Sequence, residues 1–564
     1  MPSVQRPAGT AICPRSLLLF AAVAVSITAA VQGTAVAQSA QSIPGANGGV
    51  KVGGDLDNYL RYLESLGRIP TVPWGLRGFA PTVVDSITAV RSGHPWSASW
   101  LFKKPEASSP FRILPVEIAE RYNSSYPYGI NEGPVWSGRG LTTSIAAGFA
   151  LAAGPFTAIV KPIVFRAQNQ DFPLAPNGEM GTGKFFDPRF PTHIDRPQRF
   201  GSTPYNHFDP GETTLRLDVL GFSVGATSAN EWWGPSTVFP YILGNNAAGV
   251  PRVFLGTEQP TNVYLGTIQV RVEYGLEFQS KFSPVVGPNT YTSPDSSGRE
   301  RLMSALVVTF SPRIFPGLEI VAARYFHQAW TGHFGAADLR TPFEGLLKSS
   351  LPVGVVIPGA DNRDALKNQL ASISARWVLP RSGAEVYGEY SHEDHSENLR
   401  ALEAQPDLTR IAMVGFRKAF EKADPSSFDA LRGEVFDANP TALGKYRSEG
   451  LIYEHYPIRQ GHTEEGKVIG AGVGVGAPAA AMIAWERYRS TGRTTFYLLK
   501  MSENTTTSLP SASITSGTVG LNAMRFTHFG DATLDVGAVR TTNATHGSGG
   551  WNLSVSAGIM MSVR

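Results

Sequence analysis

Apolar and polar residues alternate without interruption along residues 267–279. The apolar positions are Ile268, Val270, Val272, Tyr274, Leu276 and Phe278, and polar, charged or glycine residues stand between them. A period of two predicts a β-strand with one apolar face and one polar face. The stretch is also long: a tilted strand needs about 9–11 residues to cross a bilayer, whereas strands of soluble proteins run to about 5–6 residues.

The last stretch of the chain repeats this pattern. Its apolar positions are Leu553, Val555, Ala557, Ile559, Met561 and Val563, and only Met560 interrupts the polar face. Such strands are typical of a transmembrane barrel with lipid outside and a polar lumen. We therefore predict an all-β fold, an antiparallel transmembrane β-barrel of about 16–18 strands with a small N-terminal helical segment. The alternative is a large soluble β-sandwich.

Short turns and long loops follow one another along the chain. Turns rich in Gly, Pro, Asp and Ser join pairs of strands, and longer loops such as 167–212, 328–368 and 393–409 separate them. This asymmetry is typical of outer-membrane barrels. Between residues 231 and 299 the predicted strands are one too few for short turns and long loops to alternate. Either a strand is hidden near residues 252–257, or the segment around Trp232 folds back through the lumen.

The N-terminal part reads differently from the rest. Residues 1–37 combine a basic start, an apolar run and a small-residue cleavage site, which predicts a secretory signal peptide. Residues 38–105 are predicted to form a periplasmic or plug segment, with helices at 56–66 and 82–91, Asp55 as a cap, and Gly67 and Pro70 ending the first helix. A disordered linker is the alternative. Residues 106–564 form the predicted outer-membrane barrel.

Composition agrees with a membrane location. Only 17% of the 564 residues are charged, against about 25% in soluble proteins. The formal net charge of +3 does not indicate a nucleic-acid partner. Cys13 is the single cysteine and precedes the apolar run of the leader, so no disulfide is expected after cleavage. We expect a bacterial outer-membrane protein with outer-membrane lipid and the barrel-insertion machinery as partners.

Several motifs resemble a known family. They are NEGPVWSGRG at 131–140, NEWWGP at 230–235, FLGT at 254–257, FSPR at 310–313, FPGLE at 315–319, PRSG at 380–383 and EVYGEY at 385–390, followed by Tyr453, His455, RQG at 459–461 and GAG at 470–472. In this order they resemble the capsule-assembly Wzi family of outer-membrane proteins. The resemblance implies a barrel of about 18 strands, and a lectin-like role in which exported capsular or other surface polysaccharide is bound and anchored at the cell surface.

Sugar binding requires flat apolar faces beside hydrogen-bonding groups, and guanidinium groups for acidic glycans. The candidate polysaccharide-binding residues are Trp136, Arg139, Asn230, Glu231, Trp232 and Trp233. Their tryptophans could instead belong to the interfacial aromatic girdle. The strand period also turns charged residues into the lumen, where opposed charges are more often structural pairs than a ligand site. These residues are Arg271, Glu273, Arg376, Glu385 and Glu389.

The sequence gives little indication of a metal site, a phosphate-binding loop or a catalytic triad. The sequence from His392 to His395 offers two histidines at a strand end, a spacing that does not converge metal ligands. The glycines at 470–476 lack the lysine of a phosphate loop and are better explained by a small-residue strand beside a plug. No Ser/His/Asp set is fixed by spacing, and a hydrolase such as an outer-membrane lipase is a further alternative because the residues of a triad need not be close in sequence. We therefore predict no enzyme, no metal and no cofactor. A porin or channel for small solutes is the alternative function.

Overall fold

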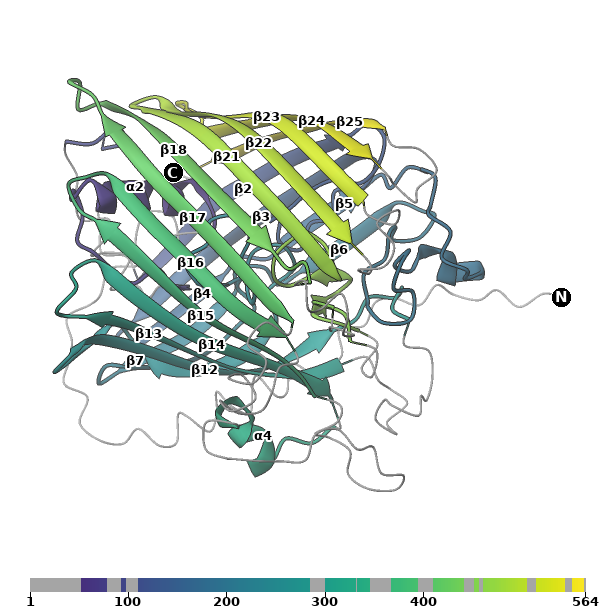
Figure 1. The fold of residues 1–564 in the computed structure, drawn as a ribbon, viewed down its shortest axis with the longest axis horizontal. Helices are drawn as coiled ribbons and strands as arrows, with labels where there is room; N and C mark the ends of the chain where they lie inside the picture. The colour runs from purple at the N-terminus through teal and green to yellow at the C-terminus, as the bar shows by residue number, and fades with distance from the viewer. Residues whose placement is uncertain are drawn as a thin grey trace.

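The computed structural model describes residues 52–78, 93–97, 110–284, 300–330, 332–344, 367–393, 409–440, 451–455, 460–504, 514–542 and 550–561. In them, an antiparallel sheet of 18 strands closes into a barrel, with a short helix near the N-terminus (Figure 1). The predicted fold class is therefore confirmed. The predicted signal peptide and the helix predicted over 82–91 lie outside the described residues. None of the helices in the described ranges is long and apolar enough to cross a membrane.

The barrel wall consists of long, strongly tilted strands. They are β2 (Phe111–Asn123), β3 (Gly140–Ala153), β4 (Phe156–Val160), β5 (Ile163–Ala167), β6 (Tyr205–Asp209), β7 (Thr214–Val219), β8 (Phe222–Thr227), β10 (Arg252–Thr257), β11 (Thr261–Val263), β12 (Gly266–Phe278), β13 (Glu300–Pro312), β14 (Leu318–Ala329), β15 (Lys367–Leu379), β16 (Ala384–Glu393), β17 (Arg410–Glu421), β18 (Ser427–Asp437), β21 (Ala477–Arg489), β22 (Gly492–Asn504), β23 (Ile514–Phe526), β24 (Asp531–Thr542) and β25 (Trp551–Met561). The pairs β4–β5, β6–β7 and β10–β11 each make up one crossing, and β2 closes the ring by pairing with both β25 and β3.

Smaller elements lie apart from the wall. They are α2 (Asp55–Ser65), α4 (Ala336–Arg340), the 3-10 helices η2 (Gly181–Phe185) and η3 (Thr341–Phe343), and the two-residue strands β1 (Leu76–Arg77), β9 (Trp232–Trp233), β19 (Thr463–Glu464) and β20 (Lys467–Val468).

The strand period separates the two faces of the wall as expected. On β12, Arg271 and Glu273 are buried, while Val272 lies on the opposite face. Apolar side chains such as Val414 and Val519 are more than half exposed on the outside of their strands. Because successive residues of a strand point to opposite faces, the wall has an apolar exterior, and the inner face of β12 is charged.

Both explanations offered for residues 231–299 are correct. Residues 252–257 form β10, which pairs with β8 and β12 in the wall. The segment around Trp232 also folds inward, where β9 pairs with β1 from the N-terminal segment. The extra strand restores the alternation of short turns and long loops, so that the short turns gather at one end of the barrel and the long loops at the other.

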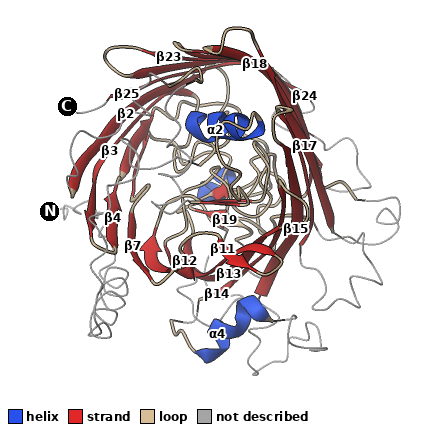
Figure 2. Ribbon diagram, turned by 90° about the vertical axis from the view of Figure 1, so that its left-hand side faces the viewer, coloured by secondary structure: helices blue, strands red, loops and turns tan. Residues whose placement is uncertain are grey.

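The lumen is filled (Figure 2). Figure 2 shows α2 and a mass of loops inside the ring of strands. Inward side chains of β13 and β14, among them Met303 and Val321, pack against lumen loops through Tyr241 and Ile469 in one buried apolar cluster. The glycines at 470–476 belong to such a lumen loop and not to the strand expected there. Burial of apolar surface therefore holds the loops in place.

Residues 57–65 of helix α2 are all buried, so burial is not confined to its predicted apolar face. The helix begins after Gly54, so Gly54 is the N-cap and the expectation of an Asp55 cap is wrong. It ends at Ser65 with Leu66 as the C-cap. Gly67 follows and terminates the helix as predicted, because its φ of +69° permits the paired terminal hydrogen bonds from Gly67 N to Glu64 O and from Arg68 N to Leu63 O. The polar face of the helix is buried because the inner wall offers charged partners to it.

Candidate binding cavity in the lumen

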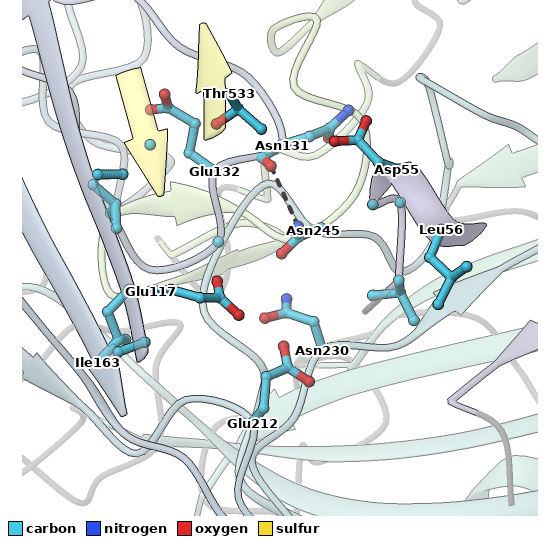
Figure 3. A pocket seen from close by; sticks show the side chains of 18 of the residues that line it. Asp55, Leu56, Glu117, Asn131, Glu132, Ile163, Glu212, Asn230, Asn245 and Thr533 are labelled. Carbon is cyan, nitrogen blue, oxygen red and sulfur yellow. Dashed lines mark hydrogen bonds between the residues drawn. The ribbon is translucent and has the colours of Figure 1, made fainter. Parts of the chain in front are cut away.

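A cavity of about 750 Å³ remains between the lumen filling and one side of the wall (Figure 3). Its wall side comes mainly from β2 to β5, β7, β8 and β22 to β25, and its inner side from α2 and from the loops 124–139 and 228–251. Binding pockets for small molecules typically measure about 300–1,000 Å³. The cavity is therefore large enough for a ligand of several rings.

The wall beside the cavity is interrupted in three crossings. The β2–β3 register shifts between Leu114 and Glu117, on either side of Pro115. Pro162 separates β4 from β5, and Pro210 lies between β6 and β7. Proline lacks the N–H that a ladder hydrogen bond requires, so it interrupts pairing within a sheet.

These interruptions turn charged groups toward the cavity. Glu117 and Lys161 form an ion pair there, and Glu212 points into the same space (Figure 3). Irregular positions in barrel walls often redirect side chains in this way. The strand period did not indicate these residues, although Pro115, Pro162 and Pro210 in otherwise strand-like segments were a signal for them.

The lumen loops contribute amides and a carboxylate. Asn131 and Glu132 come from loop 124–139, and Asn230 and Asn245 from loop 228–251. The two loops are joined by a hydrogen bond of 3.3 Å from Asn245 Nδ2 to the Asn131 carbonyl oxygen. Glu132 pairs with Arg121 of β2, with 3.0 Å between Oε1 and Nε. This side of the cavity is therefore fixed to the wall and to the rest of the lumen filling. We call this filling, which consists of α2 and the loops inside the barrel, the plug.

Glu231 connects the cavity with the inner wall. It pairs with Arg271, and its Oε1 lies 3.2 Å from Arg252 Nη2. Burial acts to raise the pKa of Glu231, but Arg271 and Arg252 outweigh it and hold this pKa below its ordinary value. The carboxylate is therefore ionised and committed to the two guanidinium groups, which supports the structural interpretation of the inward charges. Arg376, Glu385 and Glu389 are likewise buried.

The cavity offers hydrogen-bonding groups of every kind. Carboxylates, guanidinium groups, amides and hydroxyls line it, together with the rings of Tyr128, Tyr497 and Phe254. A hydroxyl-rich ligand needs both donors and acceptors around it, and an aromatic face suits its C–H groups. This arrangement suits reversible binding of a carbohydrate.

The structure separates the six candidate residues into three groups. Asn230 and Glu231 line the cavity. Trp232 and Trp233 are each 1% exposed and lie in the plug, where their indole N–H groups donate to Ser236 Oγ at 3.0 Å and Glu231 Oε2 at 2.9 Å.

Trp136 and Arg139 lie elsewhere, in the loop between β2 and β3. Trp136 packs edge-on against Phe200 at 5.1 Å between ring centroids. Arg139 donates to the carbonyl oxygens of Ser124 and Asp171. The three tryptophans therefore sit among lumen and loop side chains, not in a lipid-facing girdle.

The motif from His392 to His395 is only partly described. His392 and Glu393 are buried at the end of β16, and Asp394 and His395 lie outside the described residues. Glu393 Oε2 accepts a hydrogen bond of 2.7 Å from Tyr453 N, and Oε1 accepts one of 3.0 Å from Asn368 Nδ2. Glu393 therefore ties the loop around Tyr453 to the wall.

Comparison with known proteins adds one informative match. No family model matches the chain, and no curated protein matches it. Among solved structures it is similar to Wzi of Escherichia coli, with a TM-score of 0.58 and 13% identity over 91% of this chain and 100% of that one. The chain has the Wzi fold. Wzi is described as an outer-membrane protein involved in group 1 capsule assembly and as a carbohydrate-binding β-barrel.

Other barrels match more distantly. OccD3 of Pseudomonas aeruginosa has a TM-score of 0.36 and 10% identity over 80% of this chain and 92% of its own. OccAB3 of Acinetobacter baumannii has a TM-score of 0.38 and 7% identity over 80% and 99%.

Proposed function

We propose that this protein is an outer-membrane barrel that binds exported capsular or other surface polysaccharide and anchors it at the cell surface. The observation that carries the proposal is a barrel whose lumen is filled yet keeps a cavity of about 750 Å³ that many hydrogen-bonding groups line. The Wzi fold, in which a carbohydrate-binding barrel is known, supports it.

The filling of the lumen favours binding over free passage. Helix α2 is held by ion pairs from Arg61 to Glu385 and from Glu64 to Arg376, with all four side chains at most 1% exposed. The loops behind it share a buried apolar cluster with the wall. An open diffusion channel needs a continuous aqueous path, and this filling occupies the centre of the lumen.

The chemistry of the cavity favours a hydroxylated ligand. Its ionic groups occur largely in pairs, such as Arg121 with Glu132 and Arg493 with Asp55 at 2.8 Å. Such paired charges present hydrogen-bonding atoms without a strong net field, which suits neutral or weakly acidic sugars.

Direct contacts are proposed for the residues that line the cavity. Asn230 and Glu231 remain proposed contacts on the inner side of the cavity, with Glu231 held in place by Arg271 and Arg252. Glu132 and Glu212 join them. Trp136 and Arg139 remain predicted contacts in the loop between β2 and β3. For Trp232 and Trp233 a stacking role would require the plug to move, so we expect alanine at either position first to loosen the lumen filling.

A small-solute channel is the second candidate, and one observation favours it. The cavity lining extends from Gly53 and Gly54, at the start of α2, to Tyr128 and Asn131 in loop 124–139. Because α2 lies near the short turns and this loop at the opposite end, the lining spans much of the barrel. Steady porin-like conductance of the intact protein in planar bilayers would support the channel and contradict the plugged barrel.

A pair of neighbouring residues allows a matched binding experiment. Ser556 lines the cavity, whereas Ala557 is exposed on the outer face of β25. We expect Ser556→Trp to fill the cavity and to weaken binding of the host's purified surface polysaccharide at least tenfold by isothermal titration calorimetry. Ala557→Trp adds the same volume on the outer face and should leave binding unchanged. Equal binding by both variants would exclude the cavity as the glycan site.

A further inference from the structure

Three potential metal ligands converge where the plug meets the wall. His207 and Asp209 lie two residues apart on β6, so both point inward. Glu465 lies in the turn between β19 and β20 and has a φ of +46°. One donor atom from each of the three side chains lies within 4.8 Å of the other two. Wall and plug thus supply one set of donors.

The spacing is close to that of a coordination sphere. His207 Nε2 lies 2.8 Å from Glu465 Oε2. Zinc bonds to histidine nitrogen and carboxylate oxygen measure about 2.0–2.2 Å, so two ligands of one zinc ion lie at most about 4.4 Å apart. Small side-chain rotations would therefore bring all three donors onto one ion.

The cluster holds two carboxylates and one imidazole, and the imidazole pairs with Glu465, so a divalent cation would compensate the charge of both acids. Two carboxylates, Asp209 and Glu465, lie close together, and like charges at short range repel. The neighbouring Lys467 does not neutralise them by contact, because its Nζ donates to the carbonyl oxygens of Gly133 and Val135 at 2.7 and 2.6 Å.

The ligands are also oriented. Asp209 Oδ1 accepts a hydrogen bond of 2.7 Å from Gly211 N. Tyr205 Oη lies 3.4 Å from His207 Nδ1. With the imidazole proton on Nδ1, Nε2 would offer its lone pair to a metal in place of its present contact with Glu465. The side chains of His207 and Glu465 are 18% and 36% exposed, so an ion can reach them.

We propose that His207, Asp209 and Glu465 bind one Zn²⁺ ion and thereby fasten the β19–β20 hairpin to the barrel wall. Imidazole with two carboxylates is a donor set suited to zinc, with a water as fourth ligand. The bound ion would link the plug to the wall. The site is independent of the proposed glycan function.

The test is Zn²⁺ binding by the metal-free, refolded full-length barrel in detergent, measured by equilibrium dialysis with elemental analysis. We expect one Zn²⁺ per chain, and at least tenfold weaker binding in His207→Gln, Asp209→Asn and Glu465→Gln. The control is His193→Gln, which alters a histidine paired with Glu454 at 2.8 Å and should bind Zn²⁺ like the wild type. Heat-modified gel mobility verifies that each variant is folded.

A second measurement tests whether Zn²⁺ binding fastens the β19–β20 hairpin. Zn²⁺ should slow amide hydrogen exchange in residues 463–468 of the wild type and of His193→Gln, but not of the three ligand variants. The proposal is overturned if the wild type binds no Zn²⁺, if it prefers Ca²⁺, or if the folded ligand variants bind Zn²⁺ as tightly as the control.

Discussion

The docking of α2 in the lumen depends on one arginine. Arg376 on β15 pairs with Glu64 of α2 and, at 3.0 Å, with Glu385 of β16; its guanidinium also lies 3.7 Å from Glu319. Its side chain is 1% exposed. Arg376→Met keeps much of the side-chain volume but leaves the surrounding carboxylates without their shared cation, and removing one partner of a buried ion pair costs roughly 3–5 kcal/mol.

The expected cost is at the lower end of that range. Burial raises the pKa of Glu64 even though Arg376 acts to lower it, so Glu64 can take up a proton once the arginine is gone. Glu385 also keeps its pair with Arg61. We therefore expect Arg376→Met to weaken the docking of α2 by about 3 kcal/mol, which corresponds to a roughly 100-fold larger equilibrium constant for opening of the helix and equally faster amide exchange.

Amide hydrogen exchange of residues 55–65, followed by mass spectrometry, measures this opening. A surface pair provides the control: Arg68 and Glu421 are 21% and 52% exposed, and Arg68→Met should cost at most about 1 kcal/mol. Adding Glu64→Gln to Arg376→Met should restore part of the protection. Unchanged exchange in a folded Arg376→Met barrel would refute the proposed anchoring.

Three further predictions concern the wall and the plug. Val272→Arg places a charge on the outer face and should cost about 2–4 kcal/mol in folding titrations into lipid vesicles, whereas Glu273→Gln keeps an acceptor for its arginine and should be mild; equal effects would reverse the assignment of faces. Gly148→Ala should lower folded yield in refolding assays, because a Cβ there would lie 1.9 Å from a backbone oxygen of β4, whereas Gly517→Ala has open space and should fold normally. Burial raises the pKa of Asp195 to about 6, above the 3.8 of an unfolded chain. The folded state therefore keeps the Asp195 proton up to a higher pH than the unfolded state does. The free energy of unfolding should then fall by roughly 3 kcal/mol as pH rises from about 4 to 6, and Asp195→Asn should abolish that part of the measured pH dependence.

Much of the wall could be predicted from the sequence because one rule governs it. Strand residues alternate between lipid and lumen, so the pattern on β12 predicted both its length and its faces. The same period placed Arg376 and Glu385 inside. Their pairing was expected in general terms, because buried charges need partners.

The lumen could not be predicted in the same way. Its contacts join segments far apart in the chain, as in the pairing of Arg77 with Trp232 between β1 and β9. Trp232 and Trp233 looked like a surface platform because their neighbours are polar, but those polar groups bind plug and wall atoms. The cavity was missed because Glu117 and Lys161 reach it through proline interruptions, and such interruptions have no regular period.

The measurement that tests the central claim most directly is the partition of surface polysaccharide between cells and medium. It compares the gene deletion with strains complemented by the wild type, Ser556→Trp or Ala557→Trp, at equal levels of folded protein in the outer membrane. The account predicts unchanged total polysaccharide, release into the medium in the deletion and Ser556→Trp strains, and retention on the cells with the wild type and Ala557→Trp. Polysaccharide that stays cell-bound in the deletion strain would contradict the anchoring role.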